Sequence, residues 1–335
     1  MTAVDEALQD AVTAALRERH GDRVTLTDLR TLAGGRSGVT LTADVGGLAM
    51  VDAVVVKAAP PGRRPVGRHD VLRQARVMDA VASVPGVVVP EVLAVGTEPV
   101  HFVAMTRSAG EAVEPVLAAG SVRLPAGLVR ARAECAAGML AALHHVTDIP
   151  ARPDGTSEPV ADLAAEVARW RATSEATDPE ILVGGALLAE LLEKHLPAAS
   201  AAPVLVHGDF RLGNLVFTGP TPTGLIDWEI WGITQPGVDI GWFLVFCNPD
   251  LFPGIGELVD GMPTSAELVR CYTEAGGAPV TDLEWFEAFG RFKMAAIMAH
   301  NLRRHREGRH HDPFQETLPP TIARLVKTGI ALLGG

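Results

Sequence analysis

Residues 204–231 read VLVHGDFRLGNLVFTGPTPTGLIDWEIW. Short apolar runs, typical of buried strands, alternate in this stretch with polar residues. The apolar runs are 204–206, 215–217 and 225–226. Asp209, Asn214 and Asp227 stand beside the ends of these runs, where a rigid frame can aim their side chains at one place. The stretch therefore predicts a site built from two carboxylates and one amide.

Two acids and an amide suit a hard divalent cation such as Mg²⁺, which takes oxygen ligands. A further carboxylate beside such a cation can orient an attacking hydroxyl. A His-Gly-Asp sequence on its own is more often an ordinary turn. Asp227 on its own would more often cap a turn before Trp228. The three polar residues together, in this order and between apolar runs, favour a catalytic site.

The stretch resembles the catalytic region of the aminoglycoside phosphotransferase superfamily, which shares the protein-kinase-like fold with choline kinases. Its H-G-D-x-x-x-x-N motif matches His207 to Asn214, and its later metal-binding aspartate matches Asp227. The resemblance implies that Asp209 orients or deprotonates an acceptor hydroxyl, and that Asn214 and Asp227 hold Mg²⁺. HGDFRLGNL with IDWE is especially similar to the subfamily whose kinase-like domain is sometimes fused to acyl-CoA dehydrogenases.

Two further residues are expected to support the catalytic loop. His207 belongs to the loop motif itself, and Asp239 in VDIGWFL resembles the family aspartate that starts the next helix and braces the loop. From the residues alone, the simplest role of Asp239 is to cap the N-terminus of that helix. His144 resembles a common family histidine, and we expect it to pack in the core.

The rest of the chain divides into a β-rich first third and a helical remainder. A 335-residue length suggests two domains or two lobes. We predict an α+β, two-lobed protein-kinase-like fold, with a nucleotide-binding lobe at 1–106 that includes an N-terminal helix, and a helical lobe at 107–335 that carries the catalytic loop and the acceptor site. Strands are predicted at 24–32, 39–45, 50–57, 87–95 and 100–105, and helices at 71–84, 126–146, 159–173, 183–195, 264–275, 281–307 and 319–333.

The first lobe should bind the nucleotide, ATP or GTP, that donates the phosphate. Lys57 ends an apolar run, and a buried lysine needs an anion such as a phosphate. By resemblance it contacts the α- and β-phosphates. A glycine-rich loop that covers the phosphates is expected at Gly34, Gly35, Ser37 and Gly38, and the adenine-binding hinge at Met105 and Arg107. The chain has no G-x-x-x-x-G-K-[ST] motif, so it is not a P-loop enzyme.

One residue departs from the family pattern. The segment 71–78 places Gln74 where the family usually has the glutamate that pairs with the lysine. Glutamine accepts a hydrogen bond from Lys57 but does not neutralise it, and Asp70, one turn earlier, is a candidate substitute. This departure motivates an alternative of another class, a pseudokinase that binds a nucleotide or metabolite without catalysis.

Charge and cysteine content exclude several classes of protein. The formal net charge of −11 argues against a nucleic-acid partner. Three separated cysteines make neither a disulfide framework nor a cysteine-rich zinc site. The chain shows neither a signal peptide nor an apolar run of the ~18 residues that a membrane span requires. We expect a cytoplasmic monomer or dimer that does not contact membranes.

The acceptor is expected to be a small molecule with a hydroxyl group. Residues 291–311 hold six Lys+Arg and one acid, and residues 57–76 are also basic. A basic surface disfavours a polycationic aminoglycoside and favours an anionic acceptor, such as a phosphorylated or CoA-linked hydroxy compound. The alternative interpretation of 291–311 is a solvated helix face. An antibiotic-inactivating kinase and a metabolic kinase, for example of the hydroxyacyl-CoA type, both stay open.

Overall fold

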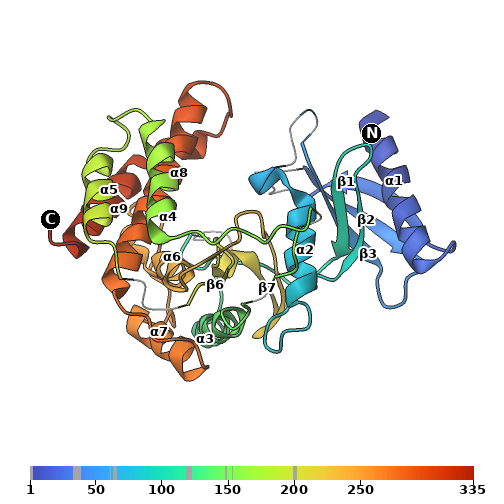
Figure 1. The fold of residues 1–335 in the computed structure, drawn as a ribbon, viewed down its shortest axis with the longest axis horizontal. Helices are drawn as coiled ribbons and strands as arrows, with labels where there is room; N and C mark the ends of the chain where they lie inside the picture. Colours follow the sequence, from blue (N-terminus) through green and yellow to red (C-terminus); the bar gives the residue numbers. More distant parts are fainter. Residues whose placement is uncertain are drawn as a thin grey trace.

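A computed structural model of the chain describes residues 3–32, 39–60, 62, 66–117, 123–147, 149–152, 154–198 and 202–335. These residues form two lobes, a sheet with two flanking helices and a larger lobe built mainly of helices (Figure 1). The predicted two-lobed α+β arrangement is confirmed. The boundary after residue 106 stays a prediction.

An antiparallel sheet with the strand order β1-β2-β3-β5-β4 forms the first lobe. Its strands are β1 (Thr25–Thr31), β2 (Val39–Gly46), β3 (Ala53–Ala58), β4 (Val92–Gly96) and β5 (Phe102–Thr106). In β3, buried and partly exposed side chains alternate, so Val54 and Val56 face the core under helix α1 (Ala3–His20). Lys57 therefore points to the opposite face of the sheet.

Helix α2 (Val71–Val81) covers that opposite face and lies toward the second lobe (Figure 1). It begins at Asp70, whose carboxylate accepts a hydrogen bond from the Arg73 amide at 3.0 Å. It ends three residues before the predicted end at 84, in a turn closed by the hydrogen bond from the Val84 amide to the Val81 carbonyl. Val77 and Met78 of α2 belong to an apolar core that also contains Leu140 and residues of the second lobe's strands.

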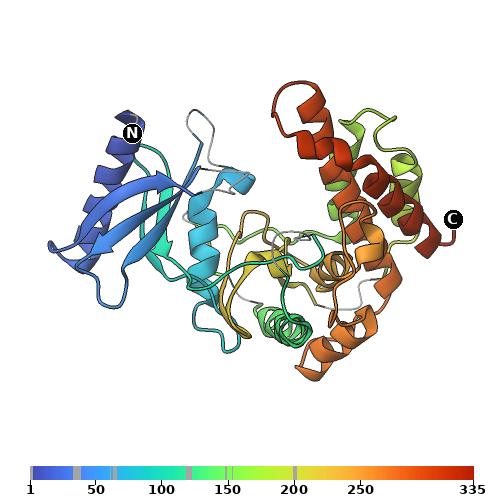
Figure 2. The ribbon, with the colours of Figure 1, turned by 180° about the vertical axis from the view of Figure 1, so that it is seen from behind.

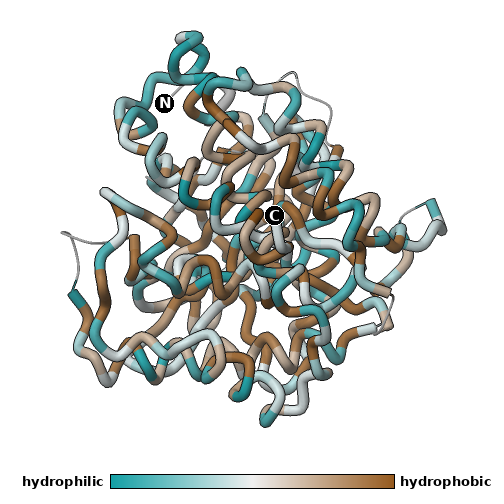
Figure 3. Tube along the Cα trace, turned by 90° about the vertical axis from the view of Figure 1, so that its left-hand side faces the viewer, coloured by the Kyte–Doolittle hydropathy of each residue, from teal (hydrophilic) through white to brown (hydrophobic). Residues whose placement is uncertain are grey.

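Seven α-helices of the described chain build the second lobe. They are α3 (Ala126–Leu143), α4 (Leu163–Glu175), α5 (Gly185–Lys194), α6 (Gly237–Cys247), α7 (Ser265–Glu274), α8 (Leu283–Arg306) and α9 (Pro319–Leu332). Every residue of α6 is buried, which makes it the central helix of the lobe. Figure 3 shows the corresponding concentration of apolar residues inside the molecule and polar residues on its outer turns.

The second lobe also contains two small strand pairs. Strand β6 (Val204–Val206) pairs with β9 (Gly232–Thr234), and β7 (Leu215–Thr218) forms a hairpin with β8 (Thr221–Leu225). Seen from behind, these yellow segments lie between α2 and the C-terminal helices (Figure 2). They carry the loops in which sequence analysis places the catalytic residues.

Most predicted elements lie within a few residues of the observed ones, with one clear exception. The strand predicted at 87–95 begins only at Val92. Pro90 lacks the amide that a strand in the middle of this segment would donate. Among the described residues, no helix has an apolar stretch long enough to cross a membrane.

Candidate active site

The ends of two strands bring Asp209 and Asp227 to the same place. Asp209 lies three residues beyond β6, and Asp227 lies two residues beyond β8. The His207 imidazole links these strand ends, because its Nε2 donates to the Ile226 carbonyl at 3.0 Å and its Nδ1 accepts from the Asp209 amide at 3.2 Å. Burial lowers the pKa of His207, so the ring stays neutral with one donor and one acceptor nitrogen. His207 therefore fixes the spacing between the two loops.

Gly208 is required by the close approach of the two loops. Its φ of +82° lies in the left-handed region, and a Cβ atom there would lie 2.3 Å from the Ile230 carbonyl oxygen. Any side chain at this position would push the two loops apart. The glycine of the motif is thus a consequence of loop packing.

The carboxylate of Asp209 is held in one orientation by three groups. Trp242 Nε1 donates to its Oδ1 at 2.8 Å, and Asn214 Nδ2 donates to its Oδ2 at 2.8 Å. The Arg211 guanidinium lies 3.4 Å from Oδ1. The side chain keeps 21% of its surface exposed, so it remains reachable from solvent. An oriented, accessible carboxylate is what general-base catalysis requires.

Lys57 and Asp227 meet across the two lobes. Lys57 Nζ lies 2.7 Å from Asp227 Oδ1, although the residues are 170 positions apart in sequence. Burial works to raise the pKa of Asp227, but the charge and hydrogen bond of Lys57 outweigh it and hold the pKa below its usual value. The backbone of Asp227 has a φ of +70°, a strained conformation for a residue with a side chain. The fold thus aims this carboxylate at the lysine despite a conformational cost.

Gln74 lies on the face of α2 that sequence analysis assigned to it. Lys57 Nζ donates to Gln74 Oε1 at 3.4 Å, a long hydrogen bond. The proposed substitution by Asp70 is wrong, because the Asp70 carboxylate caps the start of α2. In the described structure the ion-pair partner of Lys57 is Asp227.

A cluster of charges fastens α2 to the second lobe in place of a lysine–glutamate pair. Glu158, whose side chain is 2% exposed, pairs with Arg73 at 3.3 Å, with Arg152 at 3.0 Å and with Arg76. Burial works against the charged form of Glu158, but the arginines outweigh it and lower its pKa. Arg73 also donates to the Trp231 carbonyl at 3.0 Å and lies over its ring. The helix that carries Gln74 is thereby held against the segment that follows Asp227.

Asp239 braces the catalytic loop instead of capping its helix. The helix begins at Gly237 with Pro236 before it, so Asp239 lies inside the first turn and the predicted capping role is wrong. Its Oδ2 accepts from the His207 amide at 2.6 Å and its Oδ1 from the Gly208 amide at 2.8 Å. Burial works to raise the pKa of Asp239, but hydrogen bonds and the nearby histidines keep it below its usual value.

His144 has a more specific place than general core packing. Its Nδ1 lies 2.9 Å from the Tyr272 hydroxyl, and its Nε2 lies 3.5 Å from Asp239 Oδ2. Both side chains are buried. His144 therefore holds the Asp239 carboxylate, which in turn holds the catalytic loop. The sequence around His144 did not indicate this role.

Glu114 is a second support that sequence analysis missed. It accepts a hydrogen bond from the Gly213 amide at 2.9 Å and lies 3.4 Å from Arg211. Burial raises its pKa to about 7, although Arg211 and the Gly213 amide oppose the shift. Glu114 thus holds the loop between Asp209 and Asn214 through the Gly213 amide and the Arg211 side chain. It stands in a segment, EAVEP, that carries no recognisable motif.

Glu114→Gln is expected to change how stability depends on pH. With a folded-state pKa of about 7 and an ordinary value of 4.5, the native state keeps a proton that the unfolded state loses between these pH values. Stability of the native protein therefore falls as pH rises through this window, by up to ~3 kcal/mol. The glutamine variant does not titrate at this position, so it lacks this loss of stability. The difference between its free energy of unfolding and that of the native protein should therefore increase in favour of the variant between pH 5 and pH 8.

Denaturant unfolding at several pH values measures this difference. Glu190→Gln is the matched control, because Glu190 is exposed on α5. A difference between the Glu114 variant and the native protein that stays constant from pH 5 to pH 8 would contradict the assignment.

The donor atoms at the predicted metal site fit Mg²⁺. Asn214 uses Nδ2 to bond Asp209, which leaves its Oδ1 as the atom for a cation, and Asp227 offers a carboxylate. Within the described ranges, no group of three or more His, Cys, Asp and Glu side chains is placed to hold a metal ion. A site with few protein ligands suits Mg²⁺, which usually takes further ligands from water and substrate phosphates.

The remaining predicted nucleotide residues are only partly described. Gly34, Gly35, Ser37 and Gly38 lie outside the described residues. Met105 is buried in β5, where it pairs with Val55 in the sheet. Arg107 follows the strand at the junction of the lobes, and its amide lies 3.4 Å from the Ala53 carbonyl.

The basic stretch 291–311 is not a uniform solvated face. Arg291 is buried and pairs with Glu287 at 2.8 Å, and Lys293 is buried against the Gly208 carbonyl. Arg306 pairs with Glu316 at 2.7 Å. The interpretation as a solvated face is therefore wrong for Arg291 and Lys293. The charges of Arg291 and Lys293 are used inside the lobe, so these two residues give no support to an anionic acceptor.

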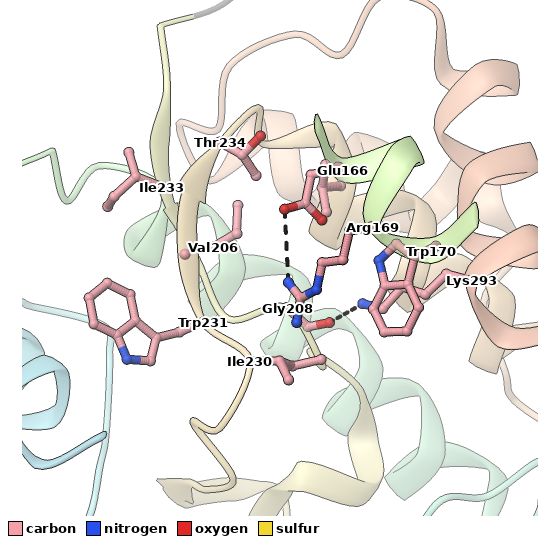
Figure 4. A pocket seen from close by; sticks show the side chains of 12 residues that line it. Glu166, Arg169, Trp170, Val206, Gly208, Ile230, Trp231, Ile233, Thr234 and Lys293 are labelled. Atoms are coloured by element: carbon pink, nitrogen blue, oxygen red, sulfur yellow. Dashed lines mark hydrogen bonds and ion pairs between the residues drawn. The ribbon is translucent and has the colours of Figure 1, made fainter. Parts of the chain in front are cut away.

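A pocket borders the catalytic loop between α4, the β6–β9 pair and α8 (Figure 4). Glu166, Arg169 and Trp170 line it from α4, and Lys293 reaches it from α8. The Glu166 carboxylate lies 3.9 Å from the Arg169 guanidinium, and the Lys293 ammonium points at the Gly208 carbonyl. The pocket thus adjoins the residue before Asp209 and contains charges of both signs.

Comparison with known proteins identifies the family to which this geometry belongs. The model of the family described as "Phosphotransferase enzyme family" matches residues 28–263, more than half of the chain. The chain belongs to this family. The match confirms the prediction that the protein is a phosphotransferase. It also confirms the predicted resemblance to this family.

Relatives of this phosphotransferase family member include both curated proteins and solved structures. Acyl-CoA dehydrogenase family member 10 of Mus musculus is 28% identical over 266 residues, which are 73% of this chain and 24% of that protein. The chain therefore spans about a quarter of that relative's length. This match agrees with the expected similarity to the subfamily associated with acyl-CoA dehydrogenases.

Two solved structures share the fold of the family member. A protein from Ralstonia eutropha JMP134, assigned to the aminoglycoside phosphotransferases, has a TM-score of 0.79 and 23% identity, with 97% of this chain and 98% of that chain covered. A thermostable mutant of aminoglycoside phosphotransferase APH(4)-Ia, in ternary complex with AMP-PNP and hygromycin B, has a TM-score of 0.59 and 16% identity, with 95% and 99% covered. The protein-kinase-like, two-lobed fold is confirmed.

Proposed function

We propose that this protein is a Mg²⁺-dependent small-molecule kinase that transfers the γ-phosphoryl group of ATP or GTP to a hydroxyl. The observation that carries this proposal is the meeting of Lys57 and Asp227 at 2.7 Å beside the oriented carboxylate of Asp209. A cation for phosphates, oxygen donors for a metal and a base for the acceptor are the parts that phosphoryl transfer requires. We propose residues 1–106 as the nucleotide lobe and 107–335 as the acceptor lobe.

In the proposed reaction, the acceptor oxygen attacks the γ-phosphorus and the bond from that phosphorus to the β-phosphate oxygen breaks. Asp209 orients the hydroxyl and receives its proton, while Lys57 holds the α- and β-phosphates. Mg²⁺ bound through Asn214 and Asp227 would neutralise charge on the phosphates. Asp239, His144 and Glu114 hold the loop so that Asp209 and Asn214 keep this geometry.

The proposed nucleotide and acceptor classes are supported by a solved structure of the same fold. A neighbour of the same fold is described in complex with AMP-PNP and hygromycin B, which supports a nucleoside triphosphate donor and a hydroxylated acceptor here. The glycine-rich loop at Gly34, Gly35, Ser37 and Gly38 and the hinge at Met105 and Arg107 are proposed as the remaining nucleotide contacts. Both an antibiotic and a metabolic hydroxy compound are acceptors to test.

A thermal-shift titration with ATP and GTP, with and without Mg²⁺, separates a kinase from a pseudokinase. We expect stabilisation that depends on Mg²⁺, about 2.7 kcal/mol at a nucleotide concentration 100 times Kd. Stabilisation that is independent of the metal, or no stabilisation, would favour the pseudokinase. Susceptibility testing of a host that expresses the protein then distinguishes an antibiotic-inactivating kinase from a metabolic one.

Gln74→Glu is expected to improve nucleotide use. An ionised partner makes a stronger, charge-assisted hydrogen bond with Lys57 than the present contact at 3.4 Å. The gain of ~1 kcal/mol predicts a rise of about fivefold in kcat/KM for the nucleotide. Gln74→Met, which removes the acceptor oxygen, should lower the same ratio. Steady-state kinetics in which both variants match the native protein would show that position 74 does not tune Lys57.

A further inference from the structure

Lys293 is a buried cation beside the catalytic loop. It lies on α8 with 3% of the residue exposed, and its ammonium donates a hydrogen bond to the Gly208 carbonyl. The same ammonium lies 3.9 Å from the centre of the Trp242 ring and 5.3 Å from that of Trp170. Two aromatic faces and one carbonyl therefore surround this charge (Figure 4 shows Lys293, Gly208 and Trp170).

Packing alone does not account for a lysine at this position. Burial lowers the pKa of Lys293 to about 8, although Asp209, Asp239 and Glu166 favour the charged form. The positive charge of Arg169, on the neighbouring helix α4, opposes the charged form of Lys293. The rings of Trp242 and Trp170 surround the end of the side chain, so a methionine of similar length would fill the same space. A charge that is costly to bury is therefore retained next to the proposed base.

The contacts of Lys293 converge on the two groups that set the position of Asp209. The Gly208 carbonyl belongs to the peptide bond whose amide is that of Asp209, and Lys293 holds it from one side. Asp239 holds the Gly208 amide from the other side at 2.8 Å. Trp242, whose ring lies under the ammonium, donates to Asp209 Oδ1 at 2.8 Å. One cation thus contacts both the backbone before Asp209 and the indole that orients its carboxylate.

We propose that Lys293 is a positioning residue for the phosphoryl transfer, which pins the Gly208–Asp209 peptide and the Trp242 indole so that Asp209 faces the acceptor hydroxyl. This inference rests on the proposed function. Lys293 acts through its neighbours, because its hydrogen bond is made to the loop backbone and its ring contacts to Trp242 and Trp170. A small displacement of a catalytic group suffices to slow turnover strongly.

Lys293→Met tests the proposal, because methionine keeps the volume and removes the charge and the donor. We expect kcat to fall by about 10- to 100-fold, the nucleotide KM to stay within about twofold, and the melting temperature not to fall. Lys327→Met is the matched control, because Lys327 is exposed on α9, and it should leave all three quantities unchanged. A kcat within twofold of the native value, or a loss of kcat matched by a loss of folded protein, would overturn the proposal.

The pH profile gives a readout that a structural role would not change. The groups that face the ammonium are Asp209, Asp239, Glu166 and Arg169. Since the folded-state pKa is about 8, kcat of the native protein should decline as pH rises through 8, and the methionine variant should lack this decline. Lys293→Arg, which stays charged, should shift the decline to higher pH. An identical alkaline limb in all three proteins would overturn the proposal.

Amide hydrogen exchange separates failure of this inference from failure of the proposed function. The Lys293→Met variant should exchange faster than the native protein in residues 207–214, whether or not an acceptor is known. Absence of phosphoryl transfer by the native protein would refute the proposed function alone. Unchanged exchange in the loop would refute the pinning by Lys293 alone.

Discussion

Asp209→Asn is expected to lower kcat by about 10²- to 10⁴-fold, the usual contribution of a positioned general base. The amide keeps the shape of the side chain and an oxygen for the Trp242 indole, which lies 2.8 Å from Oδ1, but it does not take a proton. Its nitrogen replaces Oδ2, the oxygen that accepts from Asn214 Nδ2, so the Asn214 amide must turn to pair with it. Nucleotide binding should change far less than kcat, since Lys57 and Asp227 are untouched and Asn214 keeps an amide neighbour. Initial rates and nucleotide titrations of the same preparation measure both quantities.

Asp260→Asn is the control for this comparison. Asp260 is exposed in the second lobe, so the same chemical change there should leave kcat unchanged. Turnover by the Asp209 variant at a rate close to that of the native protein would remove Asp209 from the mechanism.

Asp227→Asn is expected to abolish the Mg²⁺ dependence of nucleotide binding and to lower kcat/KM by about 10²- to 10³-fold, the size seen when one preorganised charge contact is lost. The variant loses the carboxylate that fits the metal and leaves Lys57 without its ion-pair partner at 2.7 Å. Asparagine tolerates the left-handed backbone at this position, where φ is +70°, so the loop should keep its shape. Thermal-shift titrations with and without Mg²⁺, together with kinetics, test both effects.

Asp28→Asn supplies a matched control because Asp28 is a second aspartate with positive φ, at 56°, and lies exposed in β1 far from the site. That substitution should leave nucleotide binding and its metal dependence unchanged. If the Asp227→Asn variant still requires Mg²⁺ for nucleotide binding, the assignment of this aspartate as a metal ligand is contradicted.

The part of the site that sequence analysis could predict is the part encoded in local pattern. Asp209, Asn214 and Asp227 stand next to apolar runs, and strand ends bring such residues together. The pairing of Lys57 with Gln74 followed from the resemblance to the family, which pairs this lysine with a residue of the next helix, and the structure places the two side chains in contact. The two-lobed fold followed from the change from β-rich to helical segments.

Glu114 and Lys293 could not be predicted as supporting residues because their partners are distant in sequence. Glu114 lies 99 positions from Gly213, and Lys293 lies 85 positions from Gly208. Neither stands in a motif, and each looks like an ordinary charge in a helical or irregular segment. For Asp239, the resemblance implied a brace for the loop, whereas the residues alone indicated a helix cap. The helix begins two residues earlier than a cap at Asp239 would require, and the carboxylate accepts from the loop amides.

Transfer of a labelled γ-phosphoryl group is the most direct test of the proposed reaction. The native protein and Asp209→Asn are incubated with γ-labelled ATP or GTP, Mg²⁺ and a panel of hydroxylated metabolites and antibiotics, and the acceptors are analysed by mass spectrometry. We predict a phosphorylated hydroxyl product from the native protein in the presence of Mg²⁺, and loss of that product with the Asp209 variant. Equal product from both proteins, or no product from the native protein with any acceptor while nucleotide binding is independent of Mg²⁺, would contradict the proposed reaction.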